Sequence, residues 1–223
     1  ALAVTFFIEL RQGSRNVLVG TRNFYGMLKV VEYNPTDPST RYELLLHGST
    51  THGLQFSDPL LSILPTTYYG ESSGVGRAIR NLIGPAQPRH YGLVGLGTGS
   101  LATYGEEGDH IRIYEINPEV ERLARNWFSY VDRSPADVQI VLGDARLSME
   151  QELKAGQIQG FDLLALDAFS SDAIPVHLLT QESMQLYLAH LKPDGVIAVH
   201  ISNRYLDLEP VVENLARHFG LGF

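Results

Sequence analysis

The sequence contains no cysteine among its 223 residues. This absence excludes disulfide bonds, zinc sites built on thiolates and cysteine nucleophiles. No apolar run approaches the ~18 residues that a transmembrane helix requires. The N-terminal stretch ALAVTFFIEL leads into charged, strand-like sequence instead of a signal peptide. We therefore expect no membrane span within this chain and a cytoplasmic location.

Positive charge is also scarce, since 17 Lys and Arg stand against 25 Asp and Glu, for a formal net charge of −8. This balance argues against a nucleic-acid surface, which needs clustered basic residues, and is compatible with a small cationic substrate. The 8 histidines are scattered, with no pair at the spacing of a helical zinc site, so we predict no metal. Ser170 and Ser171 have no partnered histidine and do not lie in an elbow of the G-x-S-x-G type, which argues against hydrolase chemistry.

The most informative segment is YGLVGLGTGS, residues 91–100, where an apolar run breaks into glycines. Gly95, Gly97 and Gly99 allow a tight turn and let the backbone approach a ligand that a Cβ atom would repel. Glu115 follows twenty positions after the first of these glycines. A carboxylate at that distance, on the tip of the next strand, accepts ribose hydroxyls in nucleotide-binding α/β domains.

The sequence downstream alternates between apolar strands and amphipathic helices. Pro118 is placed to begin one helix, Gly156 to end another, and Thr180 to cap a third with Ser183 in its first turn. KPDG is expected to form a turn before the last strand. The expected strands after the glycine turn are 111–118, 137–145, 161–169 and 195–203.

Strands that are apolar throughout, separated by helices, predict a parallel sheet covered on both faces. The predicted fold class is therefore α/β and Rossmann-like. Ligands of such sheets bind at the carboxyl ends of the strands. The glycine turn and the three acidic residues Glu115, Asp144 and Asp167 all fall at such ends.

The first 85 residues follow a different pattern, with short β-branched and aromatic segments separated by turn signals. We expect an antiparallel meander or small barrel there. A helical segment at 74–82 and a linker at 84–90 lead into the α/β part. The predicted domains are 1–72 (N-terminal β) and 73–223 (Rossmann-like), the latter ending where a further strand is expected, as in a trimmed portion of a longer protein. The strands expected in the first part are 5–10, 16–20, 24–33 and 41–48.

Residues from about 40 to 220 resemble the polyamine aminopropyltransferases, the spermidine synthase family, and more closely its divergent spermidine-synthase-like branch. The resemblance rests on LLLHGSTTHG, TTYYGESSGVGRAI, VGLGTGS with EINP and GDAR downstream, and FDLLALDAFSSDAIP. It implies a small N-terminal β domain before a class I S-adenosylmethionine-dependent methyltransferase fold that binds a methionine-derived sulfonium nucleoside. Some members of the branch are fused to a membrane transporter-like region, so the chain is either cytoplasmic or the soluble domain of such a protein.

The resemblance assigns nucleoside-binding roles to the strand tips. It implies that the glycine loop passes close to the sulfonium tail and that Glu115 accepts the ribose hydroxyls. Asp144, with the backbone amide of Ala145, is expected to bind the adenine edge. Relatives of this fold are commonly dimers or tetramers, so a homodimer or tetramer is expected.

The acceptor amine poses the chemical problem, because an alkyl amine with a pKa of about 10.4 is protonated at neutral pH. A carboxylate must hold the ammonium and take its proton. The resemblance implies that Asp167 is this base and that Tyr68 orients the amine. It places Asp172 and Tyr69 as further amine-binding residues, although DAFSSDAIP has two more residues between its carboxylates than the family pattern.

Two departures from the family pattern bear on the reaction. Thr98 replaces an aspartate of the glycine loop that binds the amine of the decarboxylated cosubstrate, and His47 and Thr51 replace an aspartate and a glutamine. Our first hypothesis is aminopropyl transfer from decarboxylated S-adenosylmethionine to a small diamine such as putrescine. The alternatives are an S-adenosylmethionine-dependent methyltransferase and a catalytically weak nucleoside- or polyamine-binding domain of a larger membrane protein. NAD-dependent oxidoreduction comes last, because the glycine spacing is G-x-G-x-G.

Overall fold

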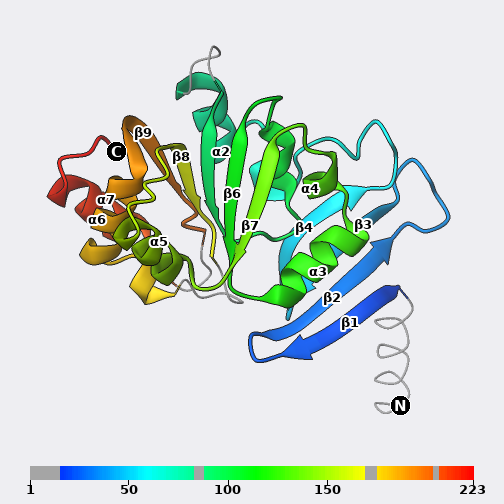
Figure 1. The fold of residues 1–223 in the computed structure, drawn as a ribbon. Coiled ribbons are helices and arrows are strands. Elements are labelled where there is room, and N and C mark those ends of the chain that lie inside the picture. The colour runs from blue at the N-terminus through cyan, green and yellow to red at the C-terminus, as the bar shows by residue number, and fades with distance from the viewer. Residues whose placement is uncertain (1–15, 83–87, 169–174, 203–205) are drawn as a thin grey trace.

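The computed structural model describes residues 16–82, 88–168, 175–202 and 206–223, and it contains two sheets (Figure 1). The first is antiparallel, in the order β1-β2-β3-β4. Its strands are β1 (Val17–Asn23), β2 (Gly26–Tyr33), β3 (Tyr42–His47) and β4 (Thr50–Phe56). The second is parallel, in the order β7-β6-β5-β8-β9. Its strands are β5 (His90–Val94), β6 (His110–Glu115), β7 (Asp137–Leu142), β8 (Phe161–Leu166) and β9 (Leu191–Val199).

The antiparallel sheet confirms the predicted meander and adds a strand that the sequence did not predict. β4 reads TTHGLQF, which is polar and contains a glycine, so its β pattern is weak. It is a strand because it pairs with β3, with a register shift between Leu44 and Leu46. The strand predicted at 5–10 lies outside the described residues.

The parallel sheet is covered on both faces, as predicted. One buried cluster joins β8 and β5 to the helices α5 (Ala145–Lys154), α6 (Gln181–His190) and α7 (Glu209–His218), which lie together in Figure 1. The other cluster lies on the opposite face and includes α3 (Pro118–Trp127), α4 (Tyr130–Arg133) and the segment from α2 (Gly74–Arg77) into a π turn (Ala78–Leu82). The strand order reverses between β5 and β8, which is the switch point where sheets of this type bind ligands.

Two details near the end of the sheet differ in their outcome. The predicted N-terminal cap of α6 is confirmed. The Thr180 side chain accepts from the Ser183 backbone amide, and the Ser183 side chain accepts from the Thr180 backbone amide. The turn predicted at KPDG is instead part of β9, which begins at Leu191. Residues 192–195 bulge there, because Phe161 pairs with Leu191 while Leu163 pairs with Val196.

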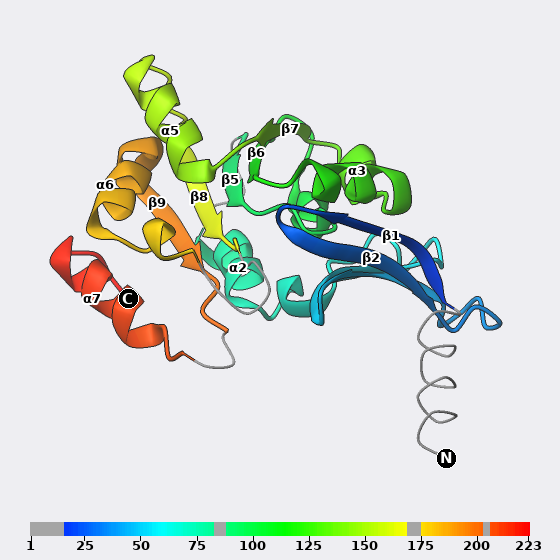
Figure 2. The ribbon, with the colours of Figure 1, turned by 90° about the horizontal axis from the view of Figure 1, so that it is seen from below.

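The antiparallel sheet packs against the α/β part, as the view from below shows (Figure 2). Leu28 and Leu45 belong to the same buried cluster as Leu123 of α3. Polar contacts reinforce this packing, since Asn23 Nδ2 donates to Asn117 Oδ1 at 2.6 Å. The two predicted domains therefore share one apolar core, and the first sheet is held over the carboxyl ends of the parallel strands.

Candidate functional site

A cleft opens where the N-terminal sheet faces the carboxyl ends of β5, β6, β7 and β8. It encloses about 820 Å³ of empty space, part of it open to solvent. The lining includes most of the predicted nucleoside-binding residues, namely Gly95, Gly97, Glu115, Asp144 and Ala145.

The glycine loop is pressed between the end of β8 and the strand β4. Gly95 has φ +101°, and a Cβ atom there would collide with the carbonyl oxygen of Asp167. Gly97 has φ +55°, and its Cβ atom would lie 2.7 Å from the carbonyl oxygen of His52. Both positions therefore need glycine for conformation and for space.

Gly99 differs from the other two glycines because it does not line the cleft. Its φ is +84°, and a Cβ atom would meet Val131 Cγ2 at 2.7 Å. It precedes a 3-10 helix, Ser100–Tyr104, that follows the loop. Gly99 thus permits the close approach of the loop to α4, and the ligand contact predicted for it remains a prediction.

Glu115 ends β6 and is 7% exposed. Its Oε2 accepts from the Leu96 amide at 2.9 Å, and its Oε1 accepts from the Asn117 amide at 2.8 Å. Burial raises the pKa of this carboxyl, and the backbone donors oppose that rise. The carboxylate therefore ties the glycine loop to β6 while it lines the cleft.

Asp144 lies at the tip of the neighbouring strand and caps α5. Its Oδ1 accepts from the Leu147 amide at 3.0 Å, and its Oδ2 contacts His177 Nε2 at 2.8 Å. His177 was not predicted, because its partner is 33 residues away and the contact arises only from the fold. Asp144 and the buried Ala145 remain placed at the wall of the cleft, as predicted.

Asp167 follows β8, and its backbone amide donates to the Val94 carbonyl at 2.8 Å. Its Oδ1 lies 2.7 Å from His200 Nδ1, and the Tyr68 hydroxyl donates to the same carboxylate. Burial raises the pKa of Asp167, against the opposing influence of His200 and Tyr68. A raised pKa makes this carboxylate a better proton acceptor than an ordinary surface aspartate.

A second cavity lies on the other side of Asp167 and encloses about 1760 Å³ of largely open space. Tyr68, Tyr69 and His200 line it, and among the described residues Asp167 alone lines both this cavity and the cleft. The Tyr68 ring stands edge-on to the His200 ring, 4.6 Å between centroids. Burial, and then the charge of Asp167, raise the pKa of Tyr68, so its hydroxyl keeps its proton at neutral pH.

The remaining acceptor-side predictions have mixed outcomes. Tyr69 is buried, its ring lies 4.5 Å from that of Tyr68, and its carbonyl accepts from Tyr104 at 2.6 Å. It therefore supports the wall of the second cavity. Asp172 lies outside the described residues. His200 was not predicted, because an isolated histidine at the end of a strand has no distinctive pattern.

Backbone strain marks the segment that carries Tyr68. Thr67 has φ +58°, a left-handed conformation that is rare for a β-branched residue. Its Oγ1 donates to the Thr66 carbonyl at 2.6 Å. Strain of this kind costs about 1–3 kcal/mol and persists where the surrounding structure requires it. Here it directs Tyr68 toward Asp167.

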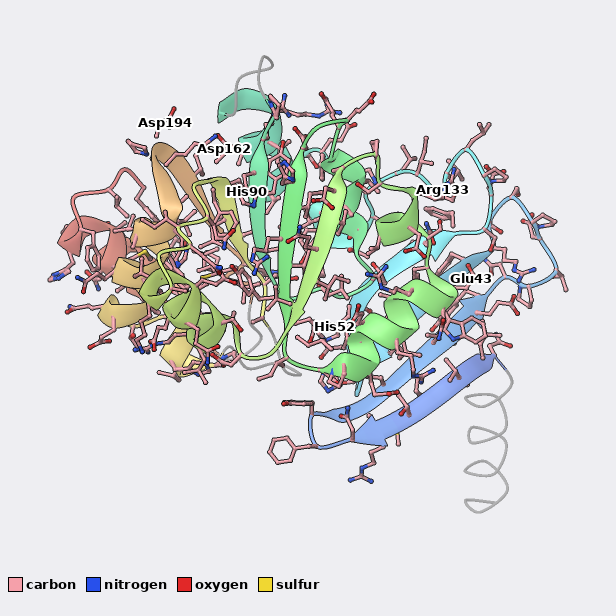
Figure 3. All side chains as sticks on the ribbon, in the orientation of Figure 1. Glu43, His52, His90, Arg133, Asp162 and Asp194 are labelled. Carbon is pink, nitrogen blue, oxygen red and sulfur yellow. The ribbon has the colours of Figure 1, made fainter. Side chains whose placement is uncertain are left out.

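The charges of the cleft have one sign. Glu115, Asp144 and Asp167 line it, and no Lys or Arg does so among the residues that the structure describes. Its polar lining also includes three histidines, at 47, 52 and 177 (Figure 3 labels His52, between the N-terminal sheet and the parallel strands). Such a cleft favours a ligand with positive charge.

The described part of the chain holds no group of three or more His, Cys, Asp or Glu arranged to bind a metal ion. Within the same residues, none of the helices has the length and apolar character to cross a bilayer.

Thr98, which replaces the family's loop aspartate, does not line the cleft. It is 1% exposed, and a Cβ atom on Gly53 of β4 would collide with its hydroxyl. The Thr98 hydroxyl has no hydrogen-bond partner among the described residues. The loop therefore supplies packing at this position and no charge.

Comparison with protein-family models gives no match. Among curated proteins, the chain is 29% identical over 129 residues to a polyamine aminopropyltransferase from Vibrio vulnificus, covering 56% of this chain and 42% of that protein. It is 33% identical over 109 residues to an N-terminal histidine N-methyltransferase from Emericella nidulans, covering 48% of this chain and 18% of that protein. The chain thus spans less than half the length of either relative.

Solved structures give the same two groups. A probable spermidine synthase from Corynebacterium glutamicum aligns with a TM-score of 0.66 at 18% identity, covering 91% of this chain and 70% of the other. Human methyltransferase-like protein 13 in complex with SAH aligns with a TM-score of 0.51 at 22% identity, covering 59% and 63%. The fold is therefore that of the class I S-adenosylmethionine-dependent methyltransferases. Within that class, the chain is similar in sequence to a polyamine aminopropyltransferase and in fold to a probable spermidine synthase.

Proposed function

We propose that this protein transfers an aminopropyl group from decarboxylated S-adenosylmethionine to a small amine such as putrescine. The observation that carries the proposal is the position of Asp167, a buried carboxylate between an acidic cleft at the strand tips and a second cavity. The name of the Vibrio vulnificus relative supports the same reaction.

The charge of the cleft supports the decarboxylated cosubstrate. That molecule carries a sulfonium and an ammonium and has no carboxylate. Glu115, Asp144 and Asp167 supply negative charge along the cleft, whereas a carboxylate on the ligand would find no Lys or Arg in the described lining. Because an unpaired charge is costly to bury, this lining discriminates against a carboxylated ligand.

The proposed reaction is a single displacement. The amine nitrogen forms a bond to the aminopropyl carbon next to sulfur, and the carbon–sulfur bond breaks with its electron pair passing to sulfur. Methylthioadenosine leaves as a neutral thioether, so the leaving group needs no acid. The proton that the nitrogen loses passes to the carboxylate of Asp167.

The residues around Asp167 fit this role. An ionised carboxylate has about four acceptor sites, of which the Tyr68 hydroxyl occupies one, while His200 Nδ1 lies 2.7 Å from Oδ1. The remaining sites are available to an incoming ammonium. Tyr68 and His200 hold the carboxylate at the junction of the two cavities, so the amine approaches from the second cavity and the sulfonium carbon from the cleft.

Methyl transfer from S-adenosylmethionine is the second candidate. It is favoured by Thr98, because the loop provides no carboxylate for the aminopropyl ammonium. It also agrees with the name of the Emericella nidulans relative, an N-methyltransferase. Both candidates place an S-adenosyl sulfonium in the cleft and a nitrogen nucleophile at Asp167.

Two measurements distinguish the candidates. Calorimetry should show tighter binding of decarboxylated S-adenosylmethionine than of S-adenosylmethionine, and the reverse order would favour methyl transfer. Product analysis with putrescine should show methylthioadenosine release together with an aminopropylated amine. Binding of the nucleoside without any turnover would indicate the sensing domain that the sequence also allowed.

A further inference from the structure

We infer that His52 of β4 forms the subsite for the cosubstrate tail, where its ring nitrogen accepts a hydrogen bond from the alkyl ammonium. The inference rests on the proposed function and deepens it, because it names a residue that determines cosubstrate specificity. The glycine loop does not supply a contact to the ammonium, because Thr98 packs against Gly53 and does not line the cleft. The inference assigns this contact to the N-terminal sheet.

The order of residues along the cleft locates the tail. The strand tips carry Asp144 on β7, Glu115 on β6 and the glycine loop on β5, in the spatial order of the sheet. With adenine at Asp144 and ribose at Glu115, the sulfonium lies against the glycine loop. The tail must then continue between β8 and the N-terminal sheet. His52 lines this part of the cleft, since a Cβ atom on Gly97 would lie 2.7 Å from the His52 carbonyl oxygen.

The geometry of the two histidines leaves one ring nitrogen unused. His47 Nε2 lies 2.7 Å from the Tyr25 carbonyl, and since a carbonyl only accepts, this nitrogen carries the proton. Gly26 leaves room for that ring, because a Cβ atom there would lie 2.5 Å from His47 Nε2. The His52 ring lies 5.3 Å from that of His47, and its buried Nε2 has no hydrogen-bond partner among the described residues.

The surroundings keep His52 uncharged. Burial, and then the rings of His47 and His200, lower the pKa of His52 to about 4. The other ionisable groups that line the cleft are Tyr25, Tyr114, Glu115, Asp144, Asp167 and His177. A neutral imidazole has one nitrogen with a lone pair, so it can accept from an ammonium without repelling it.

The test compares two ligands that differ in the tail. Methylthioadenosine contains the nucleoside and a neutral thioether sulfur, without the aminopropyl group and without the sulfonium charge. The ratio of its Kd to that of decarboxylated S-adenosylmethionine therefore reports both differences, and a change of this ratio between wild type and variant reports the replaced side chain's effect on them. His52→Leu should lower this ratio about 10- to 150-fold, the range expected for one charge-assisted hydrogen bond, with methylthioadenosine affinity unchanged. His52→Gln, which restores an acceptor, should keep the ratio within about threefold of the wild type.

His177→Leu serves as the matched control, because this histidine lines the opposite end of the cleft beside Asp144. It should weaken both ligands equally and leave the ratio unchanged. An unchanged ratio in His52→Leu would overturn the inference, and so would an equal loss of both ligands, which indicates a structural role. Failure of the wild type to bind methylthioadenosine would instead refute the proposed function itself.

Discussion

Replacing Asp167 with asparagine removes the carboxylate at the junction of the two cavities while preserving its shape. The amide oxygen can still accept from either His200 or Tyr68, but the amide nitrogen cannot take a proton. Loss of a general base costs about 100- to 10,000-fold in rate, which corresponds to about 3–5 kcal/mol of transition-state stabilisation. We expect kcat to fall by that factor and methylthioadenosine to bind within about twofold of the wild type.

The stability of Asp167→Asn follows from the same contacts. In the variant, the amide nitrogen replaces a carboxylate oxygen, so two hydrogen-bond donors face each other. This costs about 1–3 kcal/mol of stability. Against this, the variant no longer buries a charge, and burial is the main reason that the pKa of Asp167 is raised. Since the two effects have opposite signs, we expect the free energy of unfolding to change by less than about 2 kcal/mol.

The assay is single-turnover release of methylthioadenosine from decarboxylated S-adenosylmethionine and putrescine, with binding followed separately by calorimetry. The rate should also rise with pH as Asp167 ionises, with a midpoint above 3.8, the usual value for aspartate. Asp162→Asn is the matched control, because Asp162 lies on the same strand far from the cleft and pairs with Lys192 at 2.6 Å (Figure 3). It should leave turnover unchanged and cost about 0–1 kcal/mol of stability.

The reasoning is refuted if Asp167→Asn keeps more than about a tenth of the wild-type rate, because a proton acceptor at this position would then be unnecessary. An equal loss of turnover and of methylthioadenosine binding would show instead that the carboxylate maintains the cleft. Either result would leave the fold unaffected and remove the observation on which the proposed reaction depends.

Three further changes test the cleft. Glu115→Gln should weaken methylthioadenosine binding about 10- to 100-fold by calorimetry, because the amide cannot accept from the Leu96 and Asn117 backbone amides together; unchanged binding would contradict this. Gly95→Ala should lower the free energy of unfolding by about 1–3 kcal/mol or more in denaturant titrations, because φ is +101° and the new Cβ atom would collide with the backbone after β8; a stability equal to wild type would contradict it. The pKa of His52 is 6.5 in the unfolded chain and is lowered to about 4 in the folded protein. Below pH 6.5 the unfolded state therefore binds more protons than the folded state, and the free energy of unfolding decreases as the pH falls toward 4. Relative to His52→Gln, the wild type should lose about 3 kcal/mol over that range, and parallel stability curves would exclude the buried neutral ring.

The parts of the fold that depend on local pattern could be predicted from the sequence. The apolar run at β8 indicates a buried parallel strand, and the β-branched residues of β6 and β7 indicate strands, although β7 at the sheet edge has no buried residue. The acidic tips follow directly from where each strand ends. The caps of α3 and α6 are likewise local, since Pro118 and Thr180 act on residues within one turn.

The parts of the fold and of the candidate site that depend on tertiary contacts could not be predicted from the sequence. His200 meets Asp167 across neighbouring strands, and His177 meets Asp144 from a separate loop, so no sequence spacing indicates either pair. β4 is polar and is defined by its pairing with β3. Gly99 shares the pattern of the other glycines, yet it faces α4, because the pattern predicts the turn and not which side of it each glycine faces.

The features that could not be predicted gather around the candidate site. The strained Thr67, the unused nitrogen of His52 and the buried amide nitrogen of Asn117 without a partner in the described structure each cost stability in the free protein. His52 and Asn117 line the cleft, and Thr67 precedes the tyrosine that contacts Asp167. A sulfonium nucleoside with an ammonium tail would supply acceptors and donors to these groups, so part of its binding energy would come from satisfying polar atoms that folding leaves unpaired.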